Sequence, residues 1–225
     1  MAADAMMRAW MSLIPPLALP GYGQGLEQRL IRMNKTGEIM GDGTALVIID
    51  MQMEMQHRID TGRQCVNSDA PIAIQVLATA FRDAGHPVIH VRHEDTDPVS
   101  PMHIDAPGHA PMACAVDRPG EAVFVKTTSS AFPSTELAAH LRGRGIAHLV
   151  VVGAVAGFCV NSTVRSACDL GFRVTLVTDA VIGFDLPSAG LDAQTIFNVT
   201  MGLLAADFAE LRDSGTVIAT LLGKG

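Results

Sequence analysis

The 225-residue sequence has few aromatic and few charged residues, which make up 4% and 17% of it. Hydrophobic residues reach 48%, so general disorder is excluded. Lysine and arginine number 16 against 23 acidic residues, and the net charge of −7 argues against nucleic acid as a partner. No run of about twenty apolar residues is present, so we expect neither a membrane-spanning helix nor a membrane partner.

Cysteine is also scarce. None of the four cysteines lies at the spacing of a zinc-ligand pair. A chain of this size can form a sufficient hydrophobic core without disulfides, so we expect free thiols and a reducing cytoplasm. Only Cys159 has a position that suggests a function. No function is assigned to the other three, Cys65, Cys114 and Cys168.

Motifs for nucleotide binding and for serine hydrolases are missing. The first expected strand is followed by residues 50–53 (DMQM) instead of G-x-G-x-x-G, and neither a P-loop nor a G-x-S-x-G elbow occurs. The glycine-containing segment 153–157 lacks the Lys and Ser/Thr that would follow in a phosphate loop. We therefore expect no cofactor.

Residues 1–43 differ in pattern from the rest of the chain. They contain three prolines and six glycines, and their pattern allows one short helix near residues 26–33. Arg8 and the short apolar run after it resemble a signal peptide, but Asp4 and the prolines argue against export. We expect an N-terminal arm, residues 1–43, that packs on the body or on a neighbouring subunit, and one domain at 44–225.

From residue 44 onward, strand and helix patterns alternate. A continuous apolar run such as 45–50 is typical of a strand buried on both faces of a parallel sheet. The expected strands are 45–50, 87–91, 122–126, 148–152, 172–178 and 208–211, and the expected helices are 71–84, 135–142, 160–170, 191–206 and 216–222. The alternation predicts a three-layer, doubly wound, Rossmann-like α/β fold, with a mostly parallel sheet of about six strands and helices on both faces.

Residues 93–120 have no periodicity and contain five prolines. A loop of this length in a compact domain is usually functional or disordered. It leaves the carboxyl end of the second expected strand, which is the edge where open α/β sheets bind ligands. We therefore expect it to form a wall or a lid of the substrate pocket.

Three polar residues follow expected strands. Asp50 ends the first, Lys126 ends the third, and Cys159 lies just beyond the fourth, where a helix is expected. The carboxyl ends of parallel strands meet at one edge of a sheet, so the fold would bring the three together. A helix N-terminus and an ammonium group lower a thiol pKa, and a carboxylate can accept the thiol proton. Taken singly, such residues are more often a helix cap, a surface lysine and a core thiol, but their common edge favours catalysis.

Three ordered motifs resemble those of the isochorismatase-like cysteine hydrolases, a superfamily that includes nicotinamidases and N-carbamoylsarcosine amidases. The motifs are 46–52 (LVIIDMQ), 126–132 (KTTSSAF) with Thr135 and Leu137, and 153–160 (GAVAGFCV) with Thr163, Arg165 and Ala167. The resemblance covers about residues 44–222.

This resemblance implies a role for each residue of the set. Cys159 would be the nucleophile, Asp50 the general acid/base, and Lys126 the residue that stabilises the thiolate. It also implies a non-proline cis peptide at Ala154–Val155. The backbone N–H groups of Val155 and Cys159 would then form an oxyanion hole.

The chain departs from the family pattern in two places. Residues 156–157 are Ala-Gly where the family often has a threonine, so we expect a polar contact to be lost. The Asp-x-His metal motif of nicotinamidases is absent from residues 90–95, which argues against a nicotinamidase and against a metal. His93, Glu94 and His103 are the residues that could still meet at a metal ion.

The combined prediction is a metal-independent hydrolase of an amide, carbamoyl or similar C–N bond in a small molecule. Cys159 would attack the carbonyl and release ammonia or an amine, and water would cleave the thioester with Asp50 as base. Isochorismatase proper is disfavoured, because its vinyl-ether hydrolysis does not use a cysteine.

The sequence also predicts which residues line the substrate pocket and how the chain assembles. His93, Phe132 and Phe158 are expected at the substrate pocket, although both phenylalanines could equally be core residues. The resemblance implies a homo-oligomer, either a dimer or a tetramer. Two alternatives stay open: a non-catalytic small-molecule-binding protein of the same fold, and a peroxide-sensing thiol.

Overall fold

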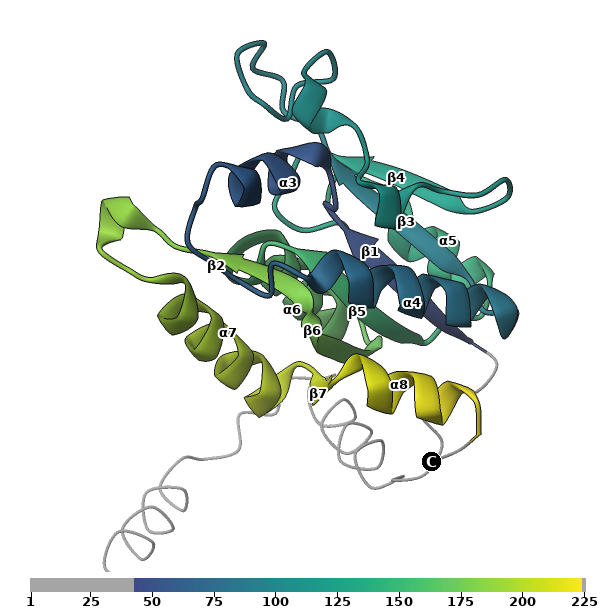
Figure 1. Cartoon of the computed structure of the whole chain (residues 1–225). Coiled ribbons are helices and arrows are strands. Elements are labelled where there is room, and N and C mark those ends of the chain that lie inside the picture. The colour runs from purple at the N-terminus through teal and green to yellow at the C-terminus, as the bar shows by residue number, and fades with distance from the viewer. Residues whose placement is uncertain (1–42, 224–225) are drawn as a thin grey trace, which may run out of the picture. The chain divides into compact units, whose positions relative to one another are not determined.

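The computed structural model describes residues 43–223, so the expected arm 1–43 and the short helix near 26–33 lie outside the described residues except for Gly43. Elements are labelled as in Figure 1. The strands are β1 (Thr44–Ile49), β2 (Cys65–Val66), β3 (Val88–His93), β4 (Ala122–Lys126), β5 (His148–Ala154), β6 (Arg173–Phe184) and β7 (Glu210–Arg212). The helices are α3 (Met53–Asp60), α4 (Ala70–Asp83), α5 (Leu137–Gly143), α6 (Asn161–Asp169), α7 (Ala193–Asp207) and α8 (Ser214–Leu221).

The strands form one sheet in the order β2-β6-β5-β1-β3-β4, with β7 also paired to β6. The pairs are parallel except for β2 with β6. From the central β1, the chain first adds β3 and β4 on one side and then β5 and β6 on the other. The strand order therefore reverses between β1 and β5, which is the place where open α/β sheets bind ligands.

Helices cover both faces of the sheet (Figure 1). Alternate residues of β1 point to opposite faces, with Val47 in one core and Ile48 in the other. Helices α5, α6 and α7 pack on the Val47 face, and α3, α4 and α8 pack on the Ile48 face. The predicted three-layer doubly wound fold is confirmed, with seven strands in place of about six. No helix within residues 43–223 is long and apolar enough to cross a membrane.

Two differences from the sequence-based elements have physical reasons. Helix α3 was not predicted, because its only buried residues are Glu54 and Met55 and it offers no apolar stripe. Strand β6 runs to Phe184 and not to 178, because its last two residues pair with the short antiparallel β2. That pairing joins residues more than a hundred positions apart and leaves no local pattern in the sequence.

The long loop between β3 and β4 is tied to the residues that follow β1. The N–H of Met53 donates to the Ala110 carbonyl (2.8 Å), and the N–H of Met112 donates to the Met51 carbonyl (2.9 Å). Short 3-10 helices at Pro107–His109 and Ala113–Ala115 give the loop its own local structure. The loop therefore stands beside the carboxyl end of β1.

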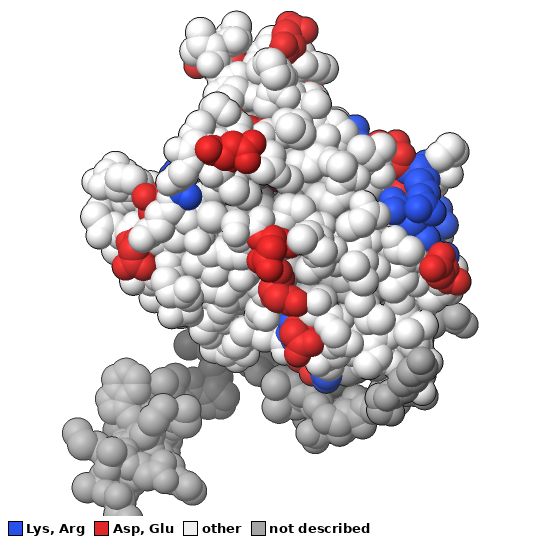
Figure 2. Space-filling view, in the orientation of Figure 1, with Lys and Arg blue, Asp and Glu red and all other residues white. Residues whose placement is uncertain are grey.

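Charged side chains are sparse on the face shown in Figure 2. Most of that face is uncharged, and its main group of Lys and Arg side chains is bordered by acidic residues. An extended basic surface of the kind that binds a phosphate backbone is therefore not present on this face.

Candidate active site

Asp50 and Lys126 form a buried ion pair at the carboxyl edge of the sheet. Asp50 directly follows β1 in a left-handed conformation, with φ of 49°, and its N–H donates to the Val91 carbonyl of β3 (2.9 Å). Lys126 is the last residue of β4. Its Nζ lies 2.8 Å from Asp50 Oδ2, and the side chains are 0% and 4% exposed. The pair therefore spans β3, which lies between the two strands.

The Lys126 ammonium contacts two further groups. Its Nζ lies 3.3 Å from Cys159 Sγ and 3.2 Å from His93 Nδ1. The fold thus brings Asp50, Lys126 and Cys159 together as the sequence argument expected, and it adds His93 at the same nitrogen. An ammonium group has three N–H donors, and here it has three acceptors.

Cys159 lies in a π-helical turn, Ala156–Val160, between β5 and α6. It was expected at the start of a regular helix, which instead begins at Asn161. Before the turn, the Ala154–Val155 peptide is cis, at the position implied by the resemblance. Gly153 is required by close packing, because its φ is 122° and a Cβ there would lie 2.1 Å from the Ile49 carbonyl oxygen.

Small residues at 156–157 are explained by packing. Ala156 is fully buried in the core on the α5, α6 and α7 side. A Cβ on Gly157 would lie 2.9 Å from the Ile196 side chain of α7. Both positions therefore lie in close packing, Ala156 in the core and Gly157 against α7.

The pKa of the thiol differs from the sequence-based expectation. Burial, and next the Asp50 carboxylate, raise the pKa of Cys159 to about 12, against the opposing effect of Lys126. Burial also raises the pKa of Asp50, while Lys126 and the Cys159 thiol act to lower it. Lys126 does lower the thiol pKa as expected, but burial and the carboxylate outweigh it, so the expected net lowering of the pKa is wrong. Cys159 rests as a thiol.

This pKa gives a prediction for alkylation. Because the reactive thiolate is a small fraction of Cys159 at neutral pH, its rate of labelling by iodoacetamide should rise about tenfold per pH unit between about pH 7 and about pH 10. Peptide mass spectrometry would follow Cys159 separately from Cys65 and Cys168, with denatured protein as the control for total thiol. A plateau near neutral pH would mean that the thiolate is already formed at rest.

His93 is held through its backbone by Gln52, which is fully buried. Gln52 Oε1 accepts from the His93 N–H (2.8 Å), and its Nε2 donates to the carbonyls of His93 (2.9 Å) and His109 (2.8 Å). Burial, and next the Lys126 charge, lower the pKa of His93, so its imidazole is neutral. Gln52 was visible only as part of the first motif, and the polar residue two positions after Asp50 was the available signal.

The two phenylalanines expected at the pocket have different surroundings. Phe132 is 8% exposed and lies in the core, where its ring stacks on Phe172 with centroids 5.9 Å apart. Phe158 precedes Cys159 and is 50% exposed. The fold therefore leaves Phe158 at the surface of the turn and packs Phe132 into the core.

A metal site does not form from the residues considered above. Within residues 43–223, no three His, Cys, Asp or Glu side chains cluster as metal ligands. Glu94 Oε2 lies 3.7 Å from His109 Nε2, and His103 Nδ1 lies 3.7 Å from Asp105 Oδ2. His93 and His103 therefore have different partners.

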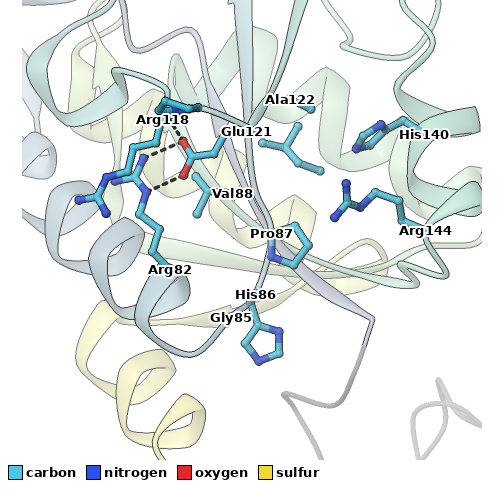
Figure 3. Close-up of a pocket in the computed structure, with 13 residues that line it drawn as sticks. Arg82, Gly85, His86, Pro87, Val88, Arg118, Glu121, Ala122, His140 and Arg144 are labelled. Carbon is cyan, nitrogen blue, oxygen red and sulfur yellow. Dashed lines mark hydrogen bonds and ion pairs between the residues drawn. The ribbon is translucent and has the colours of Figure 1, made fainter.

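A cavity of about 390 Å³ lies elsewhere, at the amino ends of β3 and β4 (Figure 3). Arg82 and Glu121 lie on one side of it and His140 and Arg144 on the other. Arg82 donates to both carboxylate oxygens of Glu121, at 2.6 and 2.8 Å. The cavity is at the opposite ends of the strands that carry His93 and Lys126, and Cys159 does not line it.

Comparison with known proteins identifies the family. The model described as the isochorismatase domain matches residues 44–201. The chain belongs to the isochorismatase family. Streptothricin hydrolase from Streptomyces noursei is 32% identical to this isochorismatase-family protein over 171 residues, which are 73% of this chain and 58% of the relative. Nicotinamidase 3 from Arabidopsis thaliana is 29% identical over 195 residues, which are 80% of this chain and 89% of the relative.

A solved structure gives the same assignment. An isochorismatase-family protein from Chromobacterium violaceum ATCC 12472 is 32% identical, with a TM-score of 0.77, and the match covers 83% of this isochorismatase-family chain and 97% of the other. The family predicted from the three motifs and the fold predicted from the alternation of strands and helices are therefore confirmed.

Proposed function

We propose that this isochorismatase-family hydrolase cleaves an amide, carbamoyl or similar C–N bond in a small molecule, with Cys159 as the nucleophile. The main support is the contact of one ammonium group, Lys126 Nζ, with both Asp50 Oδ2 (2.8 Å) and Cys159 Sγ (3.3 Å). Relatives named as a streptothricin hydrolase and a nicotinamidase support hydrolysis of amide-type bonds.

Asp50 has the free acceptor that the first proton transfer needs. Its Oδ1 is buried and has no hydrogen-bond partner among residues 43–223, while the Cys159 thiol lies near enough to affect the Asp50 pKa. The thiol proton would pass to this carboxylate. Because Lys126 contacts both groups, its charge stabilises the thiolate as it forms.

The thiolate sulfur then attacks the substrate carbonyl carbon. The negative charge that develops on the carbonyl oxygen would be held by the N–H groups of Val155 and Cys159. When the C–N bond breaks, the leaving nitrogen takes the proton from Asp50, and an acyl thioester on Cys159 remains. Asp50 then removes a proton from water, the hydroxide oxygen attacks the thioester carbonyl, and the sulfur leaves and regains a proton.

Burial has a direct function in this sequence of steps. It raises the pKa of both Asp50 and Cys159, so neither group is stable as an isolated anion in the site. Because the Lys126 ammonium contacts both groups, its charge offsets the negative charge on whichever of them has lost the proton.

The test is turnover and adduct formation on a panel of nicotinamide, N-carbamoylsarcosine and streptothricin. Release of ammonia or amine, with an acyl adduct on Cys159 in the intact mass, is the expected result for a substrate. Cys159→Ala should give neither product nor adduct. Cys65→Ala, which removes another partly exposed thiol, is its matched control.

Other results would favour the alternatives. Tight binding without product or adduct would favour a non-catalytic binding protein. A sulfenate trapped by dimedone at Cys159, without hydrolysis of any compound, would favour a peroxide-sensing thiol. The dimer or tetramer and the cytoplasmic location stay predictions from the sequence.

A further inference from the structure

We infer that His93 is a fourth working residue of this site: its Nδ1 positions the Lys126 ammonium, and its Nε2–H donates a hydrogen bond to an acceptor atom of the substrate. The inference rests on the proposed function, because it assigns His93 to the substrate site of Cys159.

The first observation is the hydrogen bonding of Lys126, whose side chain is 0% exposed. Water cannot complete the hydrogen bonds of an ammonium group at such a position. Asp50 Oδ2 and Cys159 Sγ accept from two of its N–H groups, and His93 Nδ1 (3.2 Å) accepts from the third. Without His93, one N–H of a buried cation would have no partner, which is costly and would let Lys126 move from its place between acid and nucleophile.

The second observation is that the sheet sets this contact. His93 and Lys126 are register partners on the parallel strands β3 and β4. Side chains at paired positions lie on the same face of a sheet and close together. Gln52 fixes the His93 backbone from the other side, through both its N–H and its carbonyl. The imidazole is therefore held in one place before any substrate arrives.

The third observation concerns the proton on the imidazole ring. An ammonium group can only donate, so Nδ1 must be the accepting nitrogen of a neutral imidazole, and the proton must be on Nε2. No hydrogen bond from Nε2 is found within residues 43–223, and His93 is only partly buried, so this N–H is available to a ligand. This N–H is on a ring whose Nδ1 contacts the same ammonium group as Cys159 Sγ, and it is suited to bind a carbonyl or carboxylate oxygen of the substrate.

Two substitutions separate the two roles. In His93→Asn, the amide occupies the position of Nδ1 and can still accept from Lys126, but no donor reaches the position of Nε2. In His93→Gln, the amide nitrogen reaches the position of Nε2, and the acceptor for Lys126 is lost. His103→Asn is the control, because His103 lies in the loop that follows His93 and contacts Asp105 instead.

Two alkylating reagents are the probes, and neither requires turnover. Iodoacetamide carries a carbonyl acceptor, and methyl iodide carries none. We expect His93→Asn to label about tenfold more slowly than wild type with iodoacetamide and at the wild-type rate with methyl iodide. We expect His93→Gln to label about tenfold more slowly with both reagents at a given pH, because the thiolate is less stabilised.

The outcome is independent of whether the amide panel yields a substrate. Wild-type rates for both variants with both reagents would overturn the inference. Equal losses with both reagents in both variants would also overturn it, since that pattern indicates a structural role only. Thermal unfolding of each variant, read by circular dichroism, would verify that the labelled protein is folded.

Discussion

Replacing Cys159 with alanine is expected to lower turnover of a true substrate by a factor of about ten thousand or more and to abolish the acyl adduct. The sulfur is the atom that would form the bond to the carbonyl carbon, and the Asp50 and Lys126 contacts are arranged around it. Steady-state release of ammonia or amine, together with intact mass, measures both effects. Cys159→Ser should remain at least about a thousandfold slower than wild type, because a hydroxyl proton is harder to remove.

Stability provides the control for this substitution. Cys159 is only partly buried in its turn, so Cys159→Ala should unfold near the wild-type temperature and still bind substrate. An alanine variant that hydrolyses the substrate at the wild-type rate would exclude the cysteine mechanism.

Lys126→Met is expected to destabilise the fold by roughly 3–5 kcal/mol and to remove turnover, because it leaves Asp50 as a buried carboxylate without its counter-ion. Asp50→Asn should have a similar effect through the unpaired ammonium. The double variant has neither buried charge, so we expect it to regain most of the lost stability while remaining inactive. Chemical denaturation of the four proteins forms a double-mutant cycle that isolates the coupling between the two side chains.

Additive losses in that cycle would contradict the buried pair. A double variant less stable than either single variant would mean that Asp50 and Lys126 stabilise the fold independently. Recovered activity in the double variant would mean that neither residue takes part in the reaction.

The meeting of Asp50, Lys126 and Cys159 could be predicted because it depends only on strand order. Each residue follows an apolar run, and parallel strands bring such positions to one edge. The contact of His93 with Lys126 could not be predicted, because it needs the register of β3 against β4, which apolar runs do not specify. The raised pKa of Cys159 also could not be predicted from the sequence, because it depends on burial in the folded site.

Local pattern also failed where tertiary packing decides the structure. Phe132 follows the lysine motif closely, yet its ring stacks on Phe172 from a different part of the chain. Ala156 and Gly157 suggested a lost polar contact, whereas the structure shows that Gly157 lies against Ile196 of α7. In both cases the contacting residue, Phe172 or Ile196, is about forty positions further along the sequence.

The reversal of strand order beside β1 also sets when this site can form during synthesis. Asp50, His93 and Lys126 all precede β5, and Cys159 follows it. The ribosome therefore synthesises the charged residues and His93 before Cys159. Only the docking of β5 along β1 brings the thiol to its partners. A nascent or half-folded chain therefore lacks the Lys126 contact of Cys159, and the proposed mechanism would operate only after β5 has docked.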